Sequence, residues 1–155
     1  MAFQNVDVGA IQTSLAKIKE DLNVSKEKIS SLPEGLSDTE NWKCETGTKI
    51  LQKLPKFPER IQQIIGKIEI CEAVVAKIGE YKAIEAKRNE KAEEMSGLQA
   101  DYNRMSATYL GTGGTLLPTP GYDDLGRRID ALSEEISKLE GQMAALEQEI
   151  NGMGV

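Results

Sequence analysis

The sequence contains no histidine and only two cysteines. Without histidine there can be no Ser-His-Asp or Cys-His catalysis, no His-ligated zinc and no di-iron site built on Glu-x-x-His. The two cysteines, Cys44 and Cys71, lie far apart in the chain and form no CxxC motif. We therefore expect a protein that is not an enzyme and that holds no metal and no cofactor.

Long apolar runs are also missing. No stretch approaches the roughly 18 consecutive apolar residues that a membrane-spanning helix needs. The opening MAFQNVDVGAIQTSL lacks the charged segment, apolar run and cleavage site of a secretory signal. We therefore expect no stable membrane insertion, and either a cytoplasmic location or export by a route that reads a folded signal.

Basic residues are outnumbered, and aromatic residues are few. The formal net charge is −6, from 19 Lys and Arg against 25 Asp and Glu, and this argues against a nucleic-acid-binding surface. Aromatic residues make up 5% of the 155 residues. The remaining composition is rich in Ala, Glu, Lys, Leu and Ile, which favours long helices over sheets.

The first predicted helix carries a heptad seam, meaning apolar residues spaced alternately by three and four positions. Such a seam is typical of a helix that packs lengthwise on another helix. Asp7 is a plausible N-cap for this helix, because its side chain can accept hydrogen bonds from the free amides of the first turn. The seam consists of Val8, Ile11, Leu15, Ile18, Leu22, Ile29 and Leu32.

Prolines and glycines predict the next boundaries. Pro33 and Gly35 indicate the end of the first helix, and Ser37 with Glu40 matches the S-x-x-E capping box that starts a second one. Further on, the pair Pro55–Pro58 predicts either a kink or a complete turn, and the sequence leaves both open.

The rest of the chain predicts a long helix, a loop and a last helix. The seam resumes at Phe57, Ile61, Ile64, Ile68, Cys71, Val75 and Ile78, and after a polar stretch a weaker one follows at Met95, Leu98, Tyr102, Met105 and Tyr109. The glycine- and proline-rich residues 110–122 predict a loop, without the Lys-Ser/Thr of a phosphate-binding loop. The last seam is Leu125, Ile129, Leu132, Ile136, Leu139, Met143, Leu146 and Ile150.

These patterns predict an all-α fold of elongated antiparallel helical hairpins, with four helices and coiled-coil-like packing. The first hairpin covers residues 6–86 and the second covers residues 87–152, and we expect them to form one continuous elongated domain. The last seam should pair with the region from about Ala83 to Tyr109. The acidic stretches SEEISK and EAKRNEKAEE are interleaved with Lys and Arg, so we expect solvated helix faces there.

The seams of the first hairpin are where we expect a partner, because narrow apolar stripes of this kind recruit other helices. The partner would be another helical protein, in a homodimer or a heterodimer. The predicted interaction seam consists of Ile11, Leu15, Ile18, Leu22, Ile61, Ile64, Ile68, Val75 and Ile78.

The single tryptophan, Trp42, lies in the predicted turn region of the first hairpin. An ordinary interpretation is that its ring covers the open end of the hairpin core while its N–H reaches water or a carbonyl. The sequence YKAIE adds a second feature, since Tyr81 and Glu85 are four residues apart and share one face of a helix. In an antiparallel pair of hairpins, the Trp end of one chain would lie beside the Tyr end of its partner.

A first amphipathic helix, a turn with Trp42, a second helix and the Tyr81–Glu85 spacing resemble the WXG and LXG-type substrates of type VII secretion. The resemblance covers roughly residues 6–86, and the opening VDVGAIQTSLAKIKEDL is similar to the start of LXG-type chains. The chain departs from the pattern at Cys44, which stands in place of the motif glycine, and at the Pro55–Pro58 break.

This resemblance implies a helical hairpin that acts as a partner, targeting factor or substrate in export. Trp42, Tyr81 and Glu85 would then form a bipartite export signal, read by the secretion translocase, and an LXG-type effector would be one partner. The protein would be cytoplasmic before export and would leave the cell without a cleaved signal peptide. Two other interpretations stay open: a structural coiled-coil subunit of a phage or cell-envelope assembly, and a cytoplasmic adaptor or antitoxin-like module.

The two cysteines allow one further structural alternative. If the chain turns back at Pro55–Pro58, Cys44 and Cys71 would face each other and could form a disulfide. The favoured interpretation is that both are free thiols that behave as small apolar residues.

Overall fold

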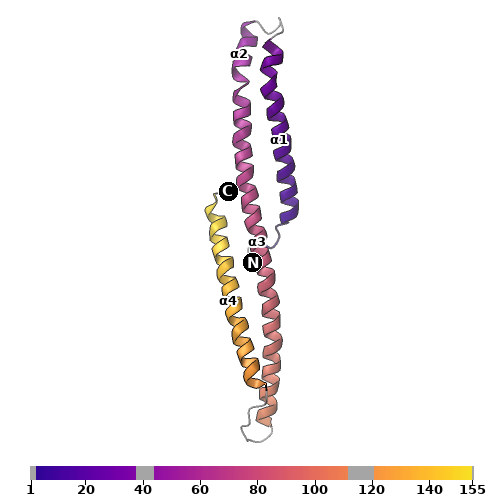
Figure 1. Ribbon diagram of the computed structural model, residues 1–155, viewed down its shortest axis with the longest axis vertical. Helices are drawn as coiled ribbons and strands as arrows, with labels where there is room; N and C mark the ends of the chain where they lie inside the picture. The colour runs from indigo at the N-terminus through magenta and orange to yellow at the C-terminus, as the bar shows by residue number, and fades with distance from the viewer. Residues whose placement is uncertain (1–2, 38–43, 112–120, 155) are drawn as a thin grey trace. The chain divides into compact units, whose positions relative to one another are not determined.

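The computed structural model describes residues 3–37, 44–111, 121–154, with side chains at 35, 37 and 107–111 left out of the description. The described residues are almost entirely helical: α1 is Val8–Ser37, α2 is Glu45–Lys53, α3 is Lys56–Gly111 and α4 is Tyr122–Gly152 (Figure 1). They include no β-strand. The all-α fold of helical hairpins is therefore confirmed. None of the helices in these ranges is long and apolar enough to cross a membrane.

The chain divides into two compact units, and α3 contributes residues to both. Unit 1 consists of Met1–Gln4 and Ile78–Gly152, and unit 2 consists of Asn5–Lys77 and Met153–Val155. The division falls at residues 77 and 78, nine residues before the boundary expected from the sequence.

Unit 2 is a hairpin in which α1 lies alongside the first part of α3 (Figure 1). Asp7 caps α1 as expected, because its Oδ1 accepts a hydrogen bond of 2.9 Å from the amide of Ala10. The core of this unit lies on the inner faces of the two helices. Its buried side chains are Ile65, Ile68 and Val75, and its half-buried ones include Leu15, Leu22, Ile29 and Ile61.

The expected end of the first helix was wrong. α1 continues through Pro33 and ends at Ser37, and the next helix begins at Glu45 with Cys44 as its N-cap. Pro33 removes one amide donor, and only a single helical turn follows it, so the loss is confined to the last turn. The half-buried Leu36 lies in that turn. Ser37 is therefore the last residue of α1, and Glu40, its expected partner in a capping box, lies outside the described residues.

The Pro55–Pro58 pair produces a kink. Leu54 keeps right-handed helical backbone angles, and the amide of Phe57 donates to the carbonyl of Leu54 at 3.0 Å. α2 and α3 follow each other in nearly the same direction (Figure 1). Pro58 is the third residue of α3, where its missing amide would have had no helical partner.

Unit 1 pairs α4 with the later part of α3, as the sequence predicted (Figure 1). Ion pairs from Arg88 to Glu140 at 2.7 Å and from Lys91 to Glu135 at 3.2 Å set an antiparallel register. Near one end, Tyr102 stacks on Tyr122 with ring centroids 4.2 Å apart. Every residue of the last seam is buried or half-buried, with Leu132, Ile136 and Leu146 most enclosed.

Candidate functional site

One side of the unit 2 hairpin is joined by polar contacts. Lys19 on α1 forms ion pairs with Glu72 at 2.9 Å and with Glu69 at 3.3 Å on α3. Two helical turns further along α1, Lys26 donates a hydrogen bond to the side-chain oxygen of Gln62. The hydrogen bond to Glu72 also raises the pKa of Lys19. These contacts fix both the antiparallel register of α1 and α3 and the side of the hairpin on which each flank lies.

The opposite side carries exposed apolar side chains. On α1, Ile18 lies on one side of the inner face and Lys19 on the other. On α3, Ile64 lies on the side that corresponds to Ile18, and Ile65 lies on the side that corresponds to Lys19. Because the Lys19 flank of α1 meets the acidic flank of α3, the flanks that hold Ile18 and Ile64 lie together on the other side. We call this surface the apolar strip. Its exposed members are Ile11, Ile18, Leu32, Phe57 and Ile64.

The residues of the predicted interaction seam fall into two groups, one packed within the chain and one exposed on the apolar strip. Leu15, Leu22 and Ile61 are half-buried, and Ile68, Val75 and Ile78 are buried, so these residues already pack within the chain. By contrast, Ile18 and Ile64 are each 48% exposed, and Ile11 is exposed as well. The second group is therefore the more accessible to another molecule. The residues of both helices recur at seven-residue intervals, which is the spacing that a partner helix can follow.

Exposed apolar residues and net charge are distributed unequally between the units. Every large apolar side chain found exposed among the described residues belongs to unit 2. Residues 5–77 contain eleven basic and eleven acidic residues, whereas residues 78–152 contain eight and fourteen. Unit 2 is therefore formally neutral, and the whole negative charge belongs to unit 1. Low net charge and exposed apolar surface are the properties that favour association, and both belong to unit 2.

Tyr81 and Glu85, the expected second half of the export signal, lie in the core of unit 1. Tyr81 is 5% exposed, and the ring of Phe3 packs edge-on against it with centroids 5.3 Å apart. Phe3 has a φ of 64°, a left-handed conformation that costs a residue with a side chain about 1–2 kcal/mol. One carboxylate oxygen of Glu85 is buried and accepts no hydrogen bond among the described residues. A protein that reads the Tyr81 ring would first have to displace Phe3.

We expect unit 1 to lose stability in alkali. Burial raises the pKa of Tyr81 above its ordinary value of 10.0, and the negative charges of Glu85 and Glu147 raise it further. The folded state therefore holds this proton more tightly than the unfolded state does, so stability is complete below pH 10 and falls as the pH rises toward the folded pKa. The measurement is Tm between pH 8 and 11.5. A Tyr81→Phe variant should show a smaller fall, and an identical fall in both proteins would contradict this assignment.

Trp42 and its surroundings, residues 38–43, lie outside the described residues. The prediction that Trp42 marks the turn or covers the hairpin core therefore stays a prediction. The meeting of Trp42 with Tyr81 of a partner chain also stays a prediction.

The cysteines are free thiols, as favoured from the sequence. Cys44 is exposed, and its Sγ accepts a hydrogen bond of 3.4 Å from the amide of Gly47 at the start of α2. Cys71 is half-buried on α3. Because the chain kinks at Pro55 and does not turn back there, the condition for a Cys44–Cys71 disulfide is not met.

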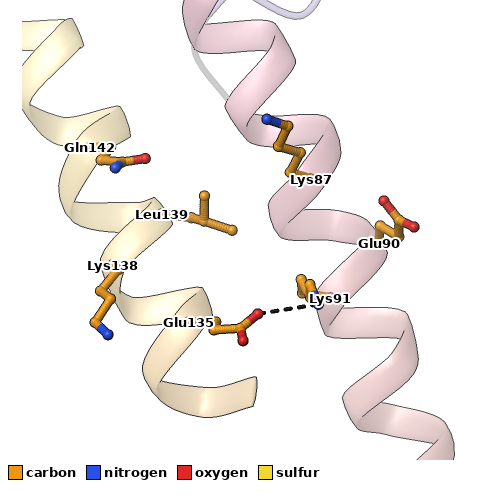
Figure 2. A pocket seen from close by; sticks show the side chains of 7 residues that line it. All are labelled: Lys87, Glu90, Lys91, Glu135, Lys138, Leu139 and Gln142. Carbon is orange, nitrogen blue, oxygen red and sulfur yellow. Dashed lines mark ion pairs between the residues drawn. The ribbon is translucent and has the colours of Figure 1, made fainter. Parts of the chain in front are cut away.

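A hollow of about 290 Å³ lies between α3 and α4 in unit 1 (Figure 2). Lys91 and Glu135 pair across it at 3.2 Å, and the hydrogen bond that Lys91 donates to Glu135 raises the pKa of Lys91. Leu139 extends from α4 toward α3 in Figure 2. The remaining lining residues are Lys87, Glu90, Lys138 and Gln142. This set contains no nucleophile paired with a base, so its chemistry is that of charged residues joining two helices.

No group of three or more potential metal ligands occurs among the described residues. The sequence interpretation missed three features of the two units: Ile65 as a core residue, Phe3 as the neighbour of Tyr81, and the Lys19 contacts. Lys19 could have been found from its position, since it lies beside the inner face of α1 at a level where α3 carries Glu69 and Glu72. Nothing in the sequence around Phe3 indicates its packing.

Comparison of the chain with protein-family models, with curated proteins and with solved structures found no match in any of the three. The class of protein is therefore defined by the fold alone, as an all-α protein of two helical hairpin units.

Proposed function

We propose that this protein works by binding another helical protein along the apolar strip of unit 2. The observation that carries the proposal is the exposure of Ile18 and Ile64, 48% each, on the side of the hairpin opposite its ion pairs. Apolar residues at seven-residue spacing on two neighbouring helices form the surface that a further helix buries in a bundle. The neutral charge of unit 2 leaves no long-range repulsion to prevent that contact.

We also propose that the binding serves type VII secretion, with this chain as a partner, targeting factor or substrate. The support is the hairpin of α1 and α3 over residues 5–77, the position of Trp42 between α1 and α2 in the sequence, and the shared helix face of Tyr81 and Glu85. The binding step would come first, and the complex would then present the signal to the translocase.

Export can be tested by measuring the protein outside and inside cells of the organism that encodes it. The variants are Trp42→Ala, Tyr81→Phe and Glu85→Gln. The last two keep most of the size of the side chain, so they alter Tyr81 and Glu85 without leaving a cavity in the core of unit 1. We expect each variant to accumulate inside with its extracellular amount reduced at least about tenfold. The matched control is Tyr102→Phe, a half-buried tyrosine elsewhere on α3, which should be exported normally.

Two results would contradict the export proposal. One is that the unaltered protein never appears outside the cell. The other is that all three variants leave the cell as efficiently as the control. In either case the binding role of the apolar strip would stand by itself, as in a cytoplasmic adaptor or an assembly subunit.

A further inference from the structure

Basic residues of the first part of α3 lie on the side of the helix that carries the apolar strip. Lys56, Arg60 and Lys67 follow one another at intervals of four and seven residues, so they lie along one line of the helix. Lys56 directly precedes Phe57 of the strip. Arg60 and Lys67 lie one helical turn after Phe57 and Ile64, respectively. We call these three residues the basic ridge. All three are exposed.

Two acidic residues of the same helix segment lie on the other flank. Glu69 and Glu72 point to the ion-pair side, where both form ion pairs with Lys19. In the described part of the chain, no ion pair involves a member of the basic ridge. The α1 edge of the strip carries one acidic residue, Asp21, and one basic residue, Lys28, so it adds no net charge. The α3 edge of the strip is therefore a line of positive charge that forms no ion pair within the described part of the chain.

A hollow of about 260 Å³ marks the end of the strip. It is lined by Lys53, Lys56, Phe57 and Arg60, so three cations surround an aromatic ring that is 49% exposed. An apolar side chain could cover the ring while a carboxylate beside it reaches the lysines. Charge-assisted contacts of this kind contribute more to the specificity of binding than to its affinity.

We propose that the apolar strip takes an acidic amphipathic helix. Its apolar residues, spaced by three and four, would cover Ile18, Phe57 and Ile64, and its Asp or Glu residues would face the basic ridge. This inference rests on the proposed binding function and adds the chemistry of the partner. A lipid surface fits less well, because the strip is narrow and the same hairpin presents the acidic residues Glu69 and Glu72 on its other flank.

The test uses the complete protein and two synthetic helical peptides of about 28 residues. Both peptides carry the same Leu and Ile seam, and the flanking positions are Glu in one and Lys in the other. We expect the Glu peptide to bind about tenfold more tightly at low salt, because three exposed ion pairs each contribute a few tenths of a kcal/mol to about 1 kcal/mol. The preference should shrink as salt is raised.

Charge reversal provides the decisive comparison. In Lys56→Glu/Arg60→Glu/Lys67→Glu the preference should reverse in favour of the Lys peptide. The control Lys87→Glu/Arg127→Glu/Lys138→Glu makes the same change in net charge on exposed residues of unit 1, and it should keep the preference for the Glu peptide. Circular dichroism would check that both variants remain helical.

Each remaining outcome has a defined meaning. Equal binding of the two peptides would overturn the acidic-helix inference and leave the binding function intact. Failure of both peptides to bind would overturn the binding function together with the inference. Binding to vesicles of anionic lipid without binding to either peptide would assign the strip to a membrane surface and overturn both.

Discussion

A Tyr81→Ala variant is expected to lose about 3–5 kcal/mol of unfolding free energy, the usual cost of removing a buried aromatic ring. Tyr81 is the most enclosed aromatic residue among those whose exposure is described, and both Phe3 and the acidic groups of unit 1 surround it. Removing the ring leaves a cavity and also removes the only described aromatic partner of Phe3. The measurement is urea or thermal unfolding followed by circular dichroism.

Tyr81→Phe is the matched control, because it keeps the ring and removes only the hydroxyl. We expect it to change the unfolding free energy by less than about 1.5 kcal/mol. If Tyr81→Ala were as stable as Tyr81→Phe, the ring could not be part of the unit 1 core. The pair also separates two explanations of a secretion defect. A defect in Tyr81→Ala alone indicates unfolding, whereas a defect in both variants indicates that the hydroxyl is read.

The helical hairpin of unit 1 could be predicted closely from the sequence. The last seam runs from Leu125 to Ile150 without interruption, and its neighbours on the chain are polar, so only one face of α4 can be buried. Its partner region on α3 also has a single apolar line, from Met95 to Met105. Where each helix offers one apolar face, the pairing follows from the pattern.

The candidate site in unit 2 could be predicted only in part, because its helices offer more apolar residues than one interface can bury. On α3, Ile64, Ile65 and Ile68 are chemically identical, and the spacing allows either Ile64 or Ile65 to face inward. The contacts of Lys19 with Glu69 and Glu72 form in the orientation of α3 that buries Ile65 and exposes Ile64. Such long-range contacts depend on the register of the two helices, which the pattern along one helix does not contain.

Two further exposed apolar residues of unit 2 provide controls for the strip. Val24 and Ile70 are 44% and 46% exposed, close to the strip residues, but they lie on the outer faces of α1 and α3, away from the strip. A Val24→Ser/Ile70→Ser protein should bind the Glu peptide normally. Exposure alone therefore does not define the site; the side of the hairpin does.

The sharpest comparison within unit 2 is between Ile68→Asp and Ile64→Asp, two identical substitutions one helical turn apart. Ile68 is 8% exposed in the core, and Ile64 is 48% exposed on the strip. A carboxylate at position 68 would have no partner in an apolar core, so we expect a loss of at least about 4 kcal/mol and unfolding of unit 2. A carboxylate at position 64 remains in water, so we expect a loss below about 1 kcal/mol.

The two variants should differ just as clearly in binding. Ile64→Asp should keep its helicity and its hydrogen-exchange protection while its affinity for the Glu peptide falls about a hundredfold, because an apolar contact is lost and a negative charge then faces the acidic partner. Ile68→Asp should lose protection in α1 and in the first part of α3. If Ile64→Asp also unfolded unit 2, Ile64 would belong to the core and the apolar strip would not exist as a surface. If it folded and bound normally, the partner would lie on another face, since no helix can cover Ile18 and Phe57 without contacting the residue between them.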